Sequence, residues 1–362
     1  MKKRKRPNYA LRRKVAVFIL IIIVLLPIII INRVKILNLH AYVPYMKYSK
    51  VVDALFESDY SKDEVVDLME YLKNNEKITE DTQNYILKLH SKGYNKNTIN
   101  FVLKNLEKKE ITSLLSKSHD KDFEKYITFD LFNYNHYKRY VEFQEEHDSL
   151  KLKDVVTRVE LNLDKDYYED TKKEKNPNSI TCLVNKYRYL DEKYIPDDLV
   201  DMDNAYANNS DNQKRLRKEA YNWFTKMVDD ANKVGIKFYA ESAFRTYDYQ
   251  ETIYNSYVNA MGKIKTDEIA ARPGYSEHQT GLAVDLANIW TLSEGMEEYE
   301  WVKKNAHKYG YIIRYEKDKE DVTGFGAETW HIRYVGKKAA NYIYKNNITF
   351  DEYYINFIDK KK

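Results

Sequence analysis

Residues 15–31 form an uninterrupted apolar segment, and no other feature of the sequence restricts the fold as strongly. The segment reads VAVFILIIIVLLPIIII and has no charged side chain. At about 1.5 Å of rise per residue, a helix of this length spans roughly 25 Å, near the lower limit for crossing a bilayer. A secretory signal usually has a shorter apolar region followed by a small-x-small cleavage site. Here Asn-Arg-Val-Lys follows at residues 32–35, so the sequence predicts an uncleaved transmembrane anchor.

The charges of the chain are distributed unevenly around this segment. The chain has 60 Lys and Arg against 56 Asp and Glu, but residues 1–14 hold eight bases and no acid. Because basic flanks stay on the cytoplasmic side, we expect a single-pass protein of the cell membrane. Residues 1–14 would form its cytoplasmic tail, and everything after about residue 32 would be extracytoplasmic. The chain after residue 14 has four more acids than bases, which argues against nucleic-acid binding.

Cysteine content excludes several kinds of site. Cys182 is the one cysteine of the chain. An intramolecular disulfide framework, a zinc cluster of thiolates and a C-x-x-C redox pair are therefore ruled out.

Residues 32–150 are expected to form a helical spacer. Apolar residues recur there at helical spacing, for example at Val65, Leu68, Met69 and Leu72. Residues 59–62 and 93–96 each precede such a run and lie 34 residues apart. Two interpretations are open, a degenerate helix-pair repeat and a chance similarity.

Residues 151–362 show a different pattern, in which helices and short strands alternate irregularly. The expected helices cover residues 247–261 and 294–308, and the expected strands cover residues 236–240, 311–315 and 330–335. A capping-box pattern at residues 349–352 predicts one more helix near the C-terminus. The absence of a regular βαβ order predicts an α+β domain with a small central antiparallel sheet and flanking helices.

A further helix is expected from a second capping-box pattern, S-x-x-Q, at residues 210–213. Gly235 is expected to end it. Its apolar face would consist of five residues, Leu216, Ala220, Trp223, Met227 and Ala231.

The residues that point to chemistry lie in three segments, 242–250, 276–285 and 328–333. In the second, His278 and Asp285 flank a Thr-Gly turn, and Asp285 stands inside an apolar run. A buried acid needs a cationic partner, which a metal ion, an arginine or a histidine provides. His331 lies in a predicted strand, and two histidines with one carboxylate are typical of a catalytic zinc site with one open position.

Two further residues complete such a site. Glu328, three residues before His331, is a carboxylate that can take a proton from metal-bound water. Arg245 offers a fixed positive charge for a developing oxyanion or for a substrate carboxylate. From the residues alone, a metal centre and a pair of structural histidines remain alternatives.

The two motifs S-x-H-x-x-G-x-A-x-D, at residues 276–285, and E-x-W-H, at residues 328–331, resemble those of the VanY-type D-alanyl-D-alanine carboxypeptidases. These are zinc peptidases of bacterial cell-wall metabolism. Both motifs occur in the family's order, with the arginine segment upstream. The resemblance covers roughly residues 133–362, leaves residues 32–132 unexplained and implies a small α+β domain with a central antiparallel sheet.

Carried over to this chain, the resemblance implies a role for each matching residue. The zinc ligands would be His278, Asp285 and His331. Glu328 would be the catalytic base, and Arg245 would stabilise the tetrahedral intermediate or hold the substrate. Contacts to the terminal D-residue would come from Ser276 and Gln250. For Trp330 packing beside the metal is favoured, whereas Arg333 is equally suited to a substrate carboxylate and to a structural ion pair.

The implied reaction is removal of D-alanine from a peptidoglycan stem peptide. Alternatives on the same zinc core are an L,D-carboxypeptidase and an endopeptidase of these peptides. An inactive module that binds wall peptides is a third, although such a module has no need of Glu328. Residues 32–150 would hold the catalytic domain away from the membrane, and docking to cell-wall synthesis proteins is a second hypothesis for them.

Overall fold

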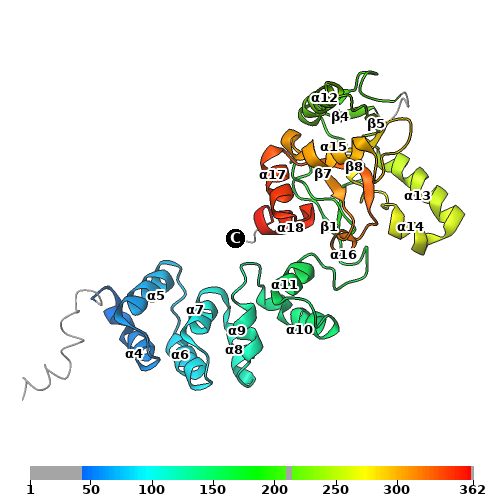
Figure 1. Cartoon of the computed structure of the whole chain (residues 1–362). Coiled ribbons are helices and arrows are strands. Elements are labelled where there is room, and N and C mark those ends of the chain that lie inside the picture. Colours follow the sequence, from blue (N-terminus) through cyan, green and yellow to red (C-terminus); the bar gives the residue numbers. More distant parts are fainter. Residues whose placement is uncertain (1–42, 209–213, 360–362) are drawn as a thin grey trace, which may run out of the picture. The chain divides into compact units, whose positions relative to one another are not determined.

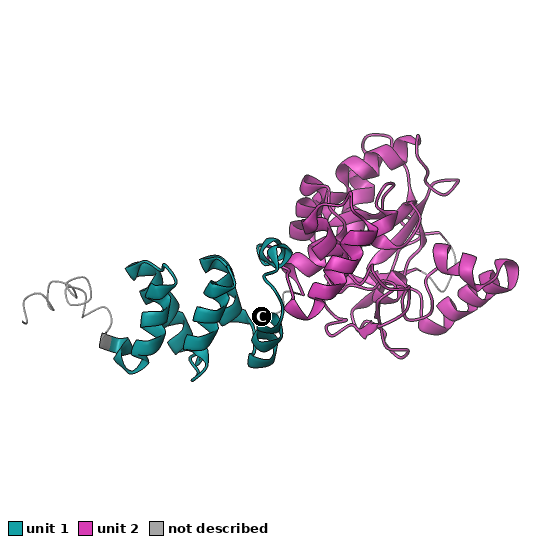
Figure 2. Cartoon of the chain, turned by 90° about the horizontal axis from the view of Figure 1, so that it is seen from below, with its two compact units in different colours: residues 1–128 teal, residues 129–362 magenta. Residues whose placement is uncertain are grey.

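The computed structural model describes residues 43–208 and 214–359 (Figure 1). The chain divides into two compact units, residues 1–128 and 129–362 (Figure 2). This division lies upstream of the boundary expected at residue 150. The predicted tail, 1–14, and the predicted anchor, 15–31, lie outside the described residues. Within the described parts of the chain, every helix is too short or too polar to cross a membrane.

Short helices arranged in consecutive pairs make up the described part of the first unit. After the 3-10 helix η1 (Val43–Tyr48), the helices are α4 (Ser49–Glu57), α5 (Lys62–Asn74), α6 (Thr82–Ser91), α7 (Lys96–Asn105), α8 (Lys108–Ser116) and α9 (Lys121–Tyr126). Each is too short to be stable alone in water, so packing between helices must stabilise them. The apolar residues at helical spacing are buried, among them Leu55, Leu68, Leu72, Ile86 and Ile99.

The two similar sequence segments occupy equivalent places in this unit. Residues 59–62 join α4 to α5, and residues 93–96 join α6 to α7. Ser61 caps α5 in a capping box, and the side chain of Asn95 caps α7 by accepting from a backbone N–H. Both segments therefore end one helix of a pair and begin the next, as the helix-pair repeat requires.

A buried tyrosine precedes each cap and reaches the following helix pair. The Tyr60 hydroxyl donates to the backbone oxygen of Lys96 at 3.1 Å. The Tyr94 hydroxyl accepts from the backbone N–H of Asp120, the cap of α9, at 3.3 Å. Both tyrosines thus contact the helix pair that follows, Tyr60 as a donor and Tyr94 as an acceptor.

The second unit begins with a 3-10 helix and two α-helices, η2 (Tyr134–His136), α10 (Tyr137–Glu146) and α11 (Leu152–Glu160). Two small two-stranded sheets follow. Strands β1 (Lys172–Lys173) and β2 (Arg188–Tyr189) are parallel, and β3 (Leu199–Asp201) and β4 (Arg215–Arg217) are antiparallel.

An antiparallel sheet of four strands lies at the centre of this unit. Its strands, in spatial order, are β5 (Tyr239–Ser242), β6 (Ala283–Ala287), β8 (Glu328–Tyr334) and β7 (Tyr311–Tyr315). The surrounding helices are α12 (Lys218–Asn232), α13 (Tyr247–Met261), α14 (Lys263–Ile269), η3 (Glu277–Thr280), α15 (Glu297–Asn305), η4 (Ala306–Tyr309), α16 (Glu320–Thr323), α17 (Lys337–Asn346) and α18 (Phe350–Phe357) (Figure 1). The predicted α+β fold with a small antiparallel sheet is confirmed.

The two faces of the sheet bury different side chains. Because successive residues of a strand point to opposite faces, alternate positions of β6 and β8 form two sets. One set packs with α12 in the main core and consists of Val284, Leu286, Ile332 and Tyr334. The set on the opposite face includes Asp285, His331 and Arg333. An acid inside an apolar run is thereby explained, since Asp285 points away from the core that its neighbours fill.

One helix starts later than the sequence predicts. The predicted cap, residues 210–213, lies outside the described residues, and α12 begins at Lys218. Leu216 belongs to β4, where it pairs with Val200, so its assignment to the helix face was wrong. The other four residues of the predicted face are buried or half-buried in the core that α12 covers. The strand expected at 236–240 lies slightly later, at Tyr239–Ser242.

Several predicted boundaries agree closely with the structure. The helix at 247–261 and the strand at 311–315 have the bounds of α13 and β7. The predicted capping box at Thr349 and Glu352 begins α18.

Candidate metal centre and active site

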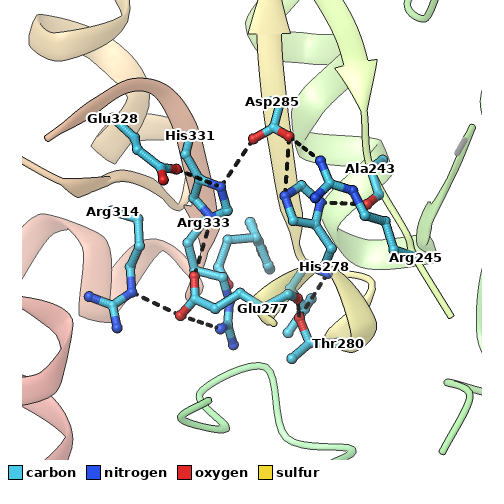
Figure 3. Close-up of polar contacts among 12 residues, drawn as sticks. Ala243, Arg245, Glu277, His278, Thr280, Asp285, Arg314, Glu328, His331 and Arg333 are labelled. Carbon is cyan, nitrogen blue, oxygen red and sulfur yellow. Dashed lines mark hydrogen bonds and ion pairs between the residues drawn. The ribbon is translucent and has the colours of Figure 1, made fainter. Parts of the chain in front are cut away.

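Three side chains that the sequence singles out converge on one point. His278 comes from η3, Asp285 from β6 and His331 from β8. One ligand atom of each lies within 4.8 Å of the others. The Asp285 carboxylate bridges the histidines, with Oδ2 3.2 Å from Nε2 of His278 and Oδ1 3.1 Å from Nδ1 of His331 (Figure 3).

Local backbone geometry explains this convergence. Asp285 and His331 are direct partners in the register of β6 with β8, so both project from the same face of the sheet. His278 is brought beside them by the turn at Gly281, which has a φ of +65°. A Cβ at Gly281 would lie 2.7 Å from Cδ2 of Leu199. The turn therefore requires glycine for two reasons, the positive φ and the lack of room for a side chain.

The orientation of His278 is set by a backbone oxygen. Nδ1 of His278 lies 2.6 Å from the carbonyl oxygen of Ala243, to which it donates. This leaves Nε2 as the acceptor that faces Asp285. Burial lowers the pKa of His278, and the charge of Arg245 lowers it further. The imidazole is therefore neutral at physiological pH, which is the form that binds metal ions.

Arg245 follows β5 and contacts the ligand carboxylate directly. Its Nη2 donates to Oδ2 of Asp285 at 2.6 Å and to the Ser242 hydroxyl at 2.8 Å. Burial opposes ionisation of Asp285, but the positive charge of Arg245 beside its Oδ2 helps to hold the pKa of Asp285 well below the ordinary value. Asp285 is consequently an anion, as a metal-binding carboxylate must be.

Glu328 stands at the start of β8, on the other side of His331. Its Oε2 lies 3.6 Å from Nδ1 of His331, and its side chain is 20% exposed. Burial raises the pKa of Glu328 to about 7, although the charge of His331 opposes that rise. A carboxyl group with such a pKa can both accept and release a proton near neutral pH.

These groups line a cavity of about 470 Å³. The hairpin of α13 and α14 forms one wall with Gln250, Ile253, Ser256, Tyr257 and Ile269. Tyr315, Phe325 and Trp330 also line the cavity. The cavity thus combines an ionic cluster with apolar walls, which is typical of sites that bind small molecules or chain ends.

The two residues predicted to contact the substrate lie in the wall of this cavity. Ser276 and Gln250 are both buried and both line the cavity. Gln250 donates to the backbone oxygen of Ala271 at 2.9 Å, which ties α13 to the segment after α14. Its Oε1 has no hydrogen-bond partner within the described part of the chain. Their contact with a substrate stays a prediction.

Trp330 and Arg333, one aromatic and one basic residue of the site region, both make structural contacts. Trp330 lines the cavity and also packs against the main core. Arg333 is fully buried and donates to Glu277 at 3.0 Å, so of its two interpretations the geometry favours the structural ion pair.

Sequence reasoning missed Glu277, which lies beside His278 inside the first motif. Its side chain is 1% exposed and contacts Arg314, Arg333 and His331. The available signal was an acid directly next to a proposed metal ligand, because an acid buried beside such a ligand needs charged or hydrogen-bonding partners.

The donor set fits a zinc ion. Two imidazole nitrogens and one carboxylate oxygen supply the three protein ligands of a catalytic zinc site, and a fourth position is left open. Among residues 43–208 and 214–359, this is the group of His, Cys, Asp and Glu side chains whose ligand atoms lie close enough together for a metal ion.

The chain is similar to known carboxypeptidases over the region that contains this site. The family model VanY, described as D-alanyl-D-alanine carboxypeptidase, matches residues 213–337. The chain is 43% identical over 208 residues to a putative carboxypeptidase, YodJ, of Bacillus subtilis (strain 168), an alignment that covers 54% of this chain and 76% of that protein. It is 39% identical over 139 residues to a D-alanyl-D-alanine carboxypeptidase of Enterococcus faecium, covering 38% of this chain and 43% of that protein. Among solved structures, the LdcB LD-carboxypeptidase matches with 40% identity and a TM-score of 0.49, over 54% of this chain and 92% of that one.

Proposed function

Because this chain belongs to the VanY family of D-alanyl-D-alanine carboxypeptidases, we propose that it removes the terminal D-alanine from peptidoglycan stem peptides. The chain is a zinc carboxypeptidase. The observation that carries the proposal is the meeting of three ligand atoms, a protonatable carboxyl group and an arginine in one cavity. Each component of metal-assisted peptide hydrolysis is thereby present.

The proposed mechanism assigns one task to each side chain. His278, Asp285 and His331 would hold a zinc ion, which would supply Lewis acidity and lower the pKa of a water molecule. Glu328, which lies 3.6 Å from His331 at the cavity, accepts the proton of the attacking water and delivers it to the leaving amine. Arg245 presents a positive charge beside the ligand carboxylate, where it stabilises the developing oxyanion.

The cavity also favours a peptide substrate over a free dipeptide. A dipeptide would need an acidic partner for its amino group. The carboxylates that line the cavity within the described residues are Glu277, Asp285 and Glu328. The first is paired with arginines, the second is a metal ligand and the third is the base. A terminal carboxylate is matched better, by the charge of Arg245 and the hydroxyl donor of Ser276.

We test the proposal with the full-length protein in detergent. A stem pentapeptide ending in D-Ala-D-Ala and the matching tetrapeptide are incubated with and without chelator, and mass spectrometry follows the products. Loss of one alanine from the pentapeptide, abolished by chelator and by Glu328→Gln, is the expected result. Cleavage of the tetrapeptide alone would assign L,D specificity instead. Stoichiometric zinc binding without cleavage of either peptide would overturn the carboxypeptidase assignment.

Membrane attachment is a separate part of the proposal. The apolar segment 15–31 and the basic tail 1–14 support a single-pass anchor with the catalytic unit outside the cytoplasm. Such a location would place the active site beside the cell wall. In intact cells, we expect protease added from outside to degrade the catalytic unit. Protection of that unit, or its recovery in the soluble fraction, would contradict the anchor.

A further inference from the structure

Glu277 is a buried carboxylate whose two oxygens have different partners. Its Oε1 accepts from Nε of Arg314 at 2.8 Å and from Nη1 of Arg333 at 3.0 Å. Its Oε2 faces Nε2 of His331 at 3.4 Å (Figure 3). Neither that oxygen nor that nitrogen has a hydrogen-bond partner elsewhere in the described part of the chain. The arginines therefore occupy one oxygen and leave the other for the histidine.

The two ring nitrogens of His331 face different groups. Nδ1 points to Asp285 and the metal position, at 3.1 Å from Oδ1 of that carboxylate. Nε2 points to Glu277. A neutral imidazole that binds a metal through Nδ1 carries its proton on Nε2 and needs an acceptor there. We propose that Glu277 is a positioning residue, which holds His331 in the tautomer and orientation that direct Nδ1 at the metal.

An unpaired Glu277 carboxylate at this buried position would be strongly destabilising. The surrounding ion pairs compensate for its burial. Arg314 pairs with Glu277 on one side and with Asp351 of α18 on the other, where Nη1 and Oδ2 are 2.7 Å apart. Arg333 adds the second positive charge. All four side chains are at most 1% exposed, and their formal charges sum to zero.

Further hydrogen bonds fix Arg333 and Asp351 in this network. Nη2 of Arg333 donates to the backbone oxygen of Cys182 at 2.8 Å. Asp351 accepts from Asn185 at 2.8 Å, which fixes the far end of the network. The C-terminal helix α18 thereby contributes, through Arg314 and Glu277, to the position of a metal ligand on β8.

Glu277→Gln separates this role from simple packing, because glutamine has the same shape. Both arginines need an acceptor, so the amide oxygen must take the place of Oε1. The amide NH₂ then faces Nε2 of His331 and donates to it, which moves the ring proton to Nδ1. The variant therefore favours the tautomer that cannot bind the metal. Loss of an outer-shell partner of this kind lowers metal affinity about 10- to 100-fold.

The readout is zinc affinity of the full-length protein, measured by competition with a chromogenic chelator, together with the visible spectrum of the cobalt-substituted protein. We expect Glu277→Gln to lower the affinity by at least about 10-fold and to alter the cobalt bands. The matched control is Glu174→Gln. Glu174 is also buried and hydrogen-bonded, to the backbone of Leu183 and to Tyr354, but it contacts none of the ligands. Its variant should lose thermal stability and keep native zinc affinity.

A second variant covers the case in which Glu277→Gln does not fold. Glu277→Asp keeps the charge between the arginines but is one methylene shorter, so it should fold and still bind zinc more weakly. Native zinc affinity in a folded Gln or Asp variant would overturn the positioning role. The positioning role of Glu277 rests on the proposed function, and the zinc measurements distinguish the failure of one from the failure of the other. An unaltered protein that binds no zinc would overturn both, whereas native affinity in the variants would leave the carboxypeptidase proposal intact.

Discussion

Replacing Glu328 by glutamine should stabilise the metal-free protein, and the gain should grow as the pH rises. Burial is the main reason why the pKa of Glu328 is raised from 4.5 to about 7. Because this pKa lies above the unfolded value, the folded state binds the proton more tightly than the unfolded state does. The associated stability is fully present below about pH 4.5 and is lost as the pH rises through 7. Glutamine cannot ionise and avoids this loss.

The size of the effect follows from the pKa. A change of one pKa unit corresponds to about 1.4 kcal/mol, so a rise from 4.5 to about 7 corresponds to roughly 3 kcal/mol at most. The side chain is 20% exposed, and contact with water reduces the penalty of ionisation. We therefore expect about 1–3 kcal/mol in the free energy of unfolding above pH 7. For a unit of this size, each kcal/mol moves Tm by about 2–4 °C.

The assay is thermal unfolding of chelator-treated protein, followed by circular dichroism between pH 5 and pH 8. The Tm of Glu328→Gln should exceed that of the unaltered protein increasingly with pH. Glu192→Gln makes the same chemical change at an exposed loop position and serves as the control. Parallel Tm profiles for Glu328→Gln and the unaltered protein would refute the reasoning, because they would mean that folding leaves the ionisation of Glu328 unchanged.

Three further predictions test other parts of the structure. Gly281→Ala should lower the free energy of unfolding by at least about 1–3 kcal/mol in thermal melts and weaken zinc binding, because the turn needs a positive φ and has no room for a Cβ. Native stability would contradict it. Arg245→Lys should lower kcat/KM about 100-fold or more, since lysine keeps the charge but cannot contact Asp285 and the cavity in the same fork geometry. Equal kcat/KM would remove Arg245 from the mechanism. Tyr94→Phe should destabilise the helical unit by about 1 kcal/mol through loss of the contact to Asp120, and a lower Tm checks it.

Elements whose pattern is local could be predicted from the sequence. The strand at 311–315 lies between a glycine and a charged segment, and the helix at 247–261 begins at the Thr246 cap, so both have start and stop signals within a few residues. The candidate ligands could be predicted because two short motifs resemble those of a known family; their spacing alone leaves a metal centre and structural histidines as alternatives. Periodicity of two explains why Asp285 is tolerated inside an apolar run.

Features that depend on distant partners could not be predicted in the same way. Leu216 continues the helical spacing of α12 but pairs in a strand with Val200, and nothing near it in the sequence shows this pairing. Glu277 likewise has partners on β7 and β8, and its β7 partner Arg314 pairs in turn with Asp351 of α18; only the fold brings these residues together. Local propensity is overridden wherever such long-range contacts decide the conformation.

The arrangement of β6 and β8 explains how one small sheet serves both stability and chemistry. In both strands, apolar residues that pack under α12 alternate with a second set, which includes Asp285 on β6 and His331 and Arg333 on β8. A substitution such as Val284→Ala removes core contacts and should lower stability by about 1–3 kcal/mol while the ligand atoms on the opposite face keep their register. A shift of register by one residue would instead move the core residues and the ligand residues to the opposite faces. The packing under α12 and the metal site would then be lost together. The pairing of Asp285 with His331 therefore sets the position of the core and of the metal site at once.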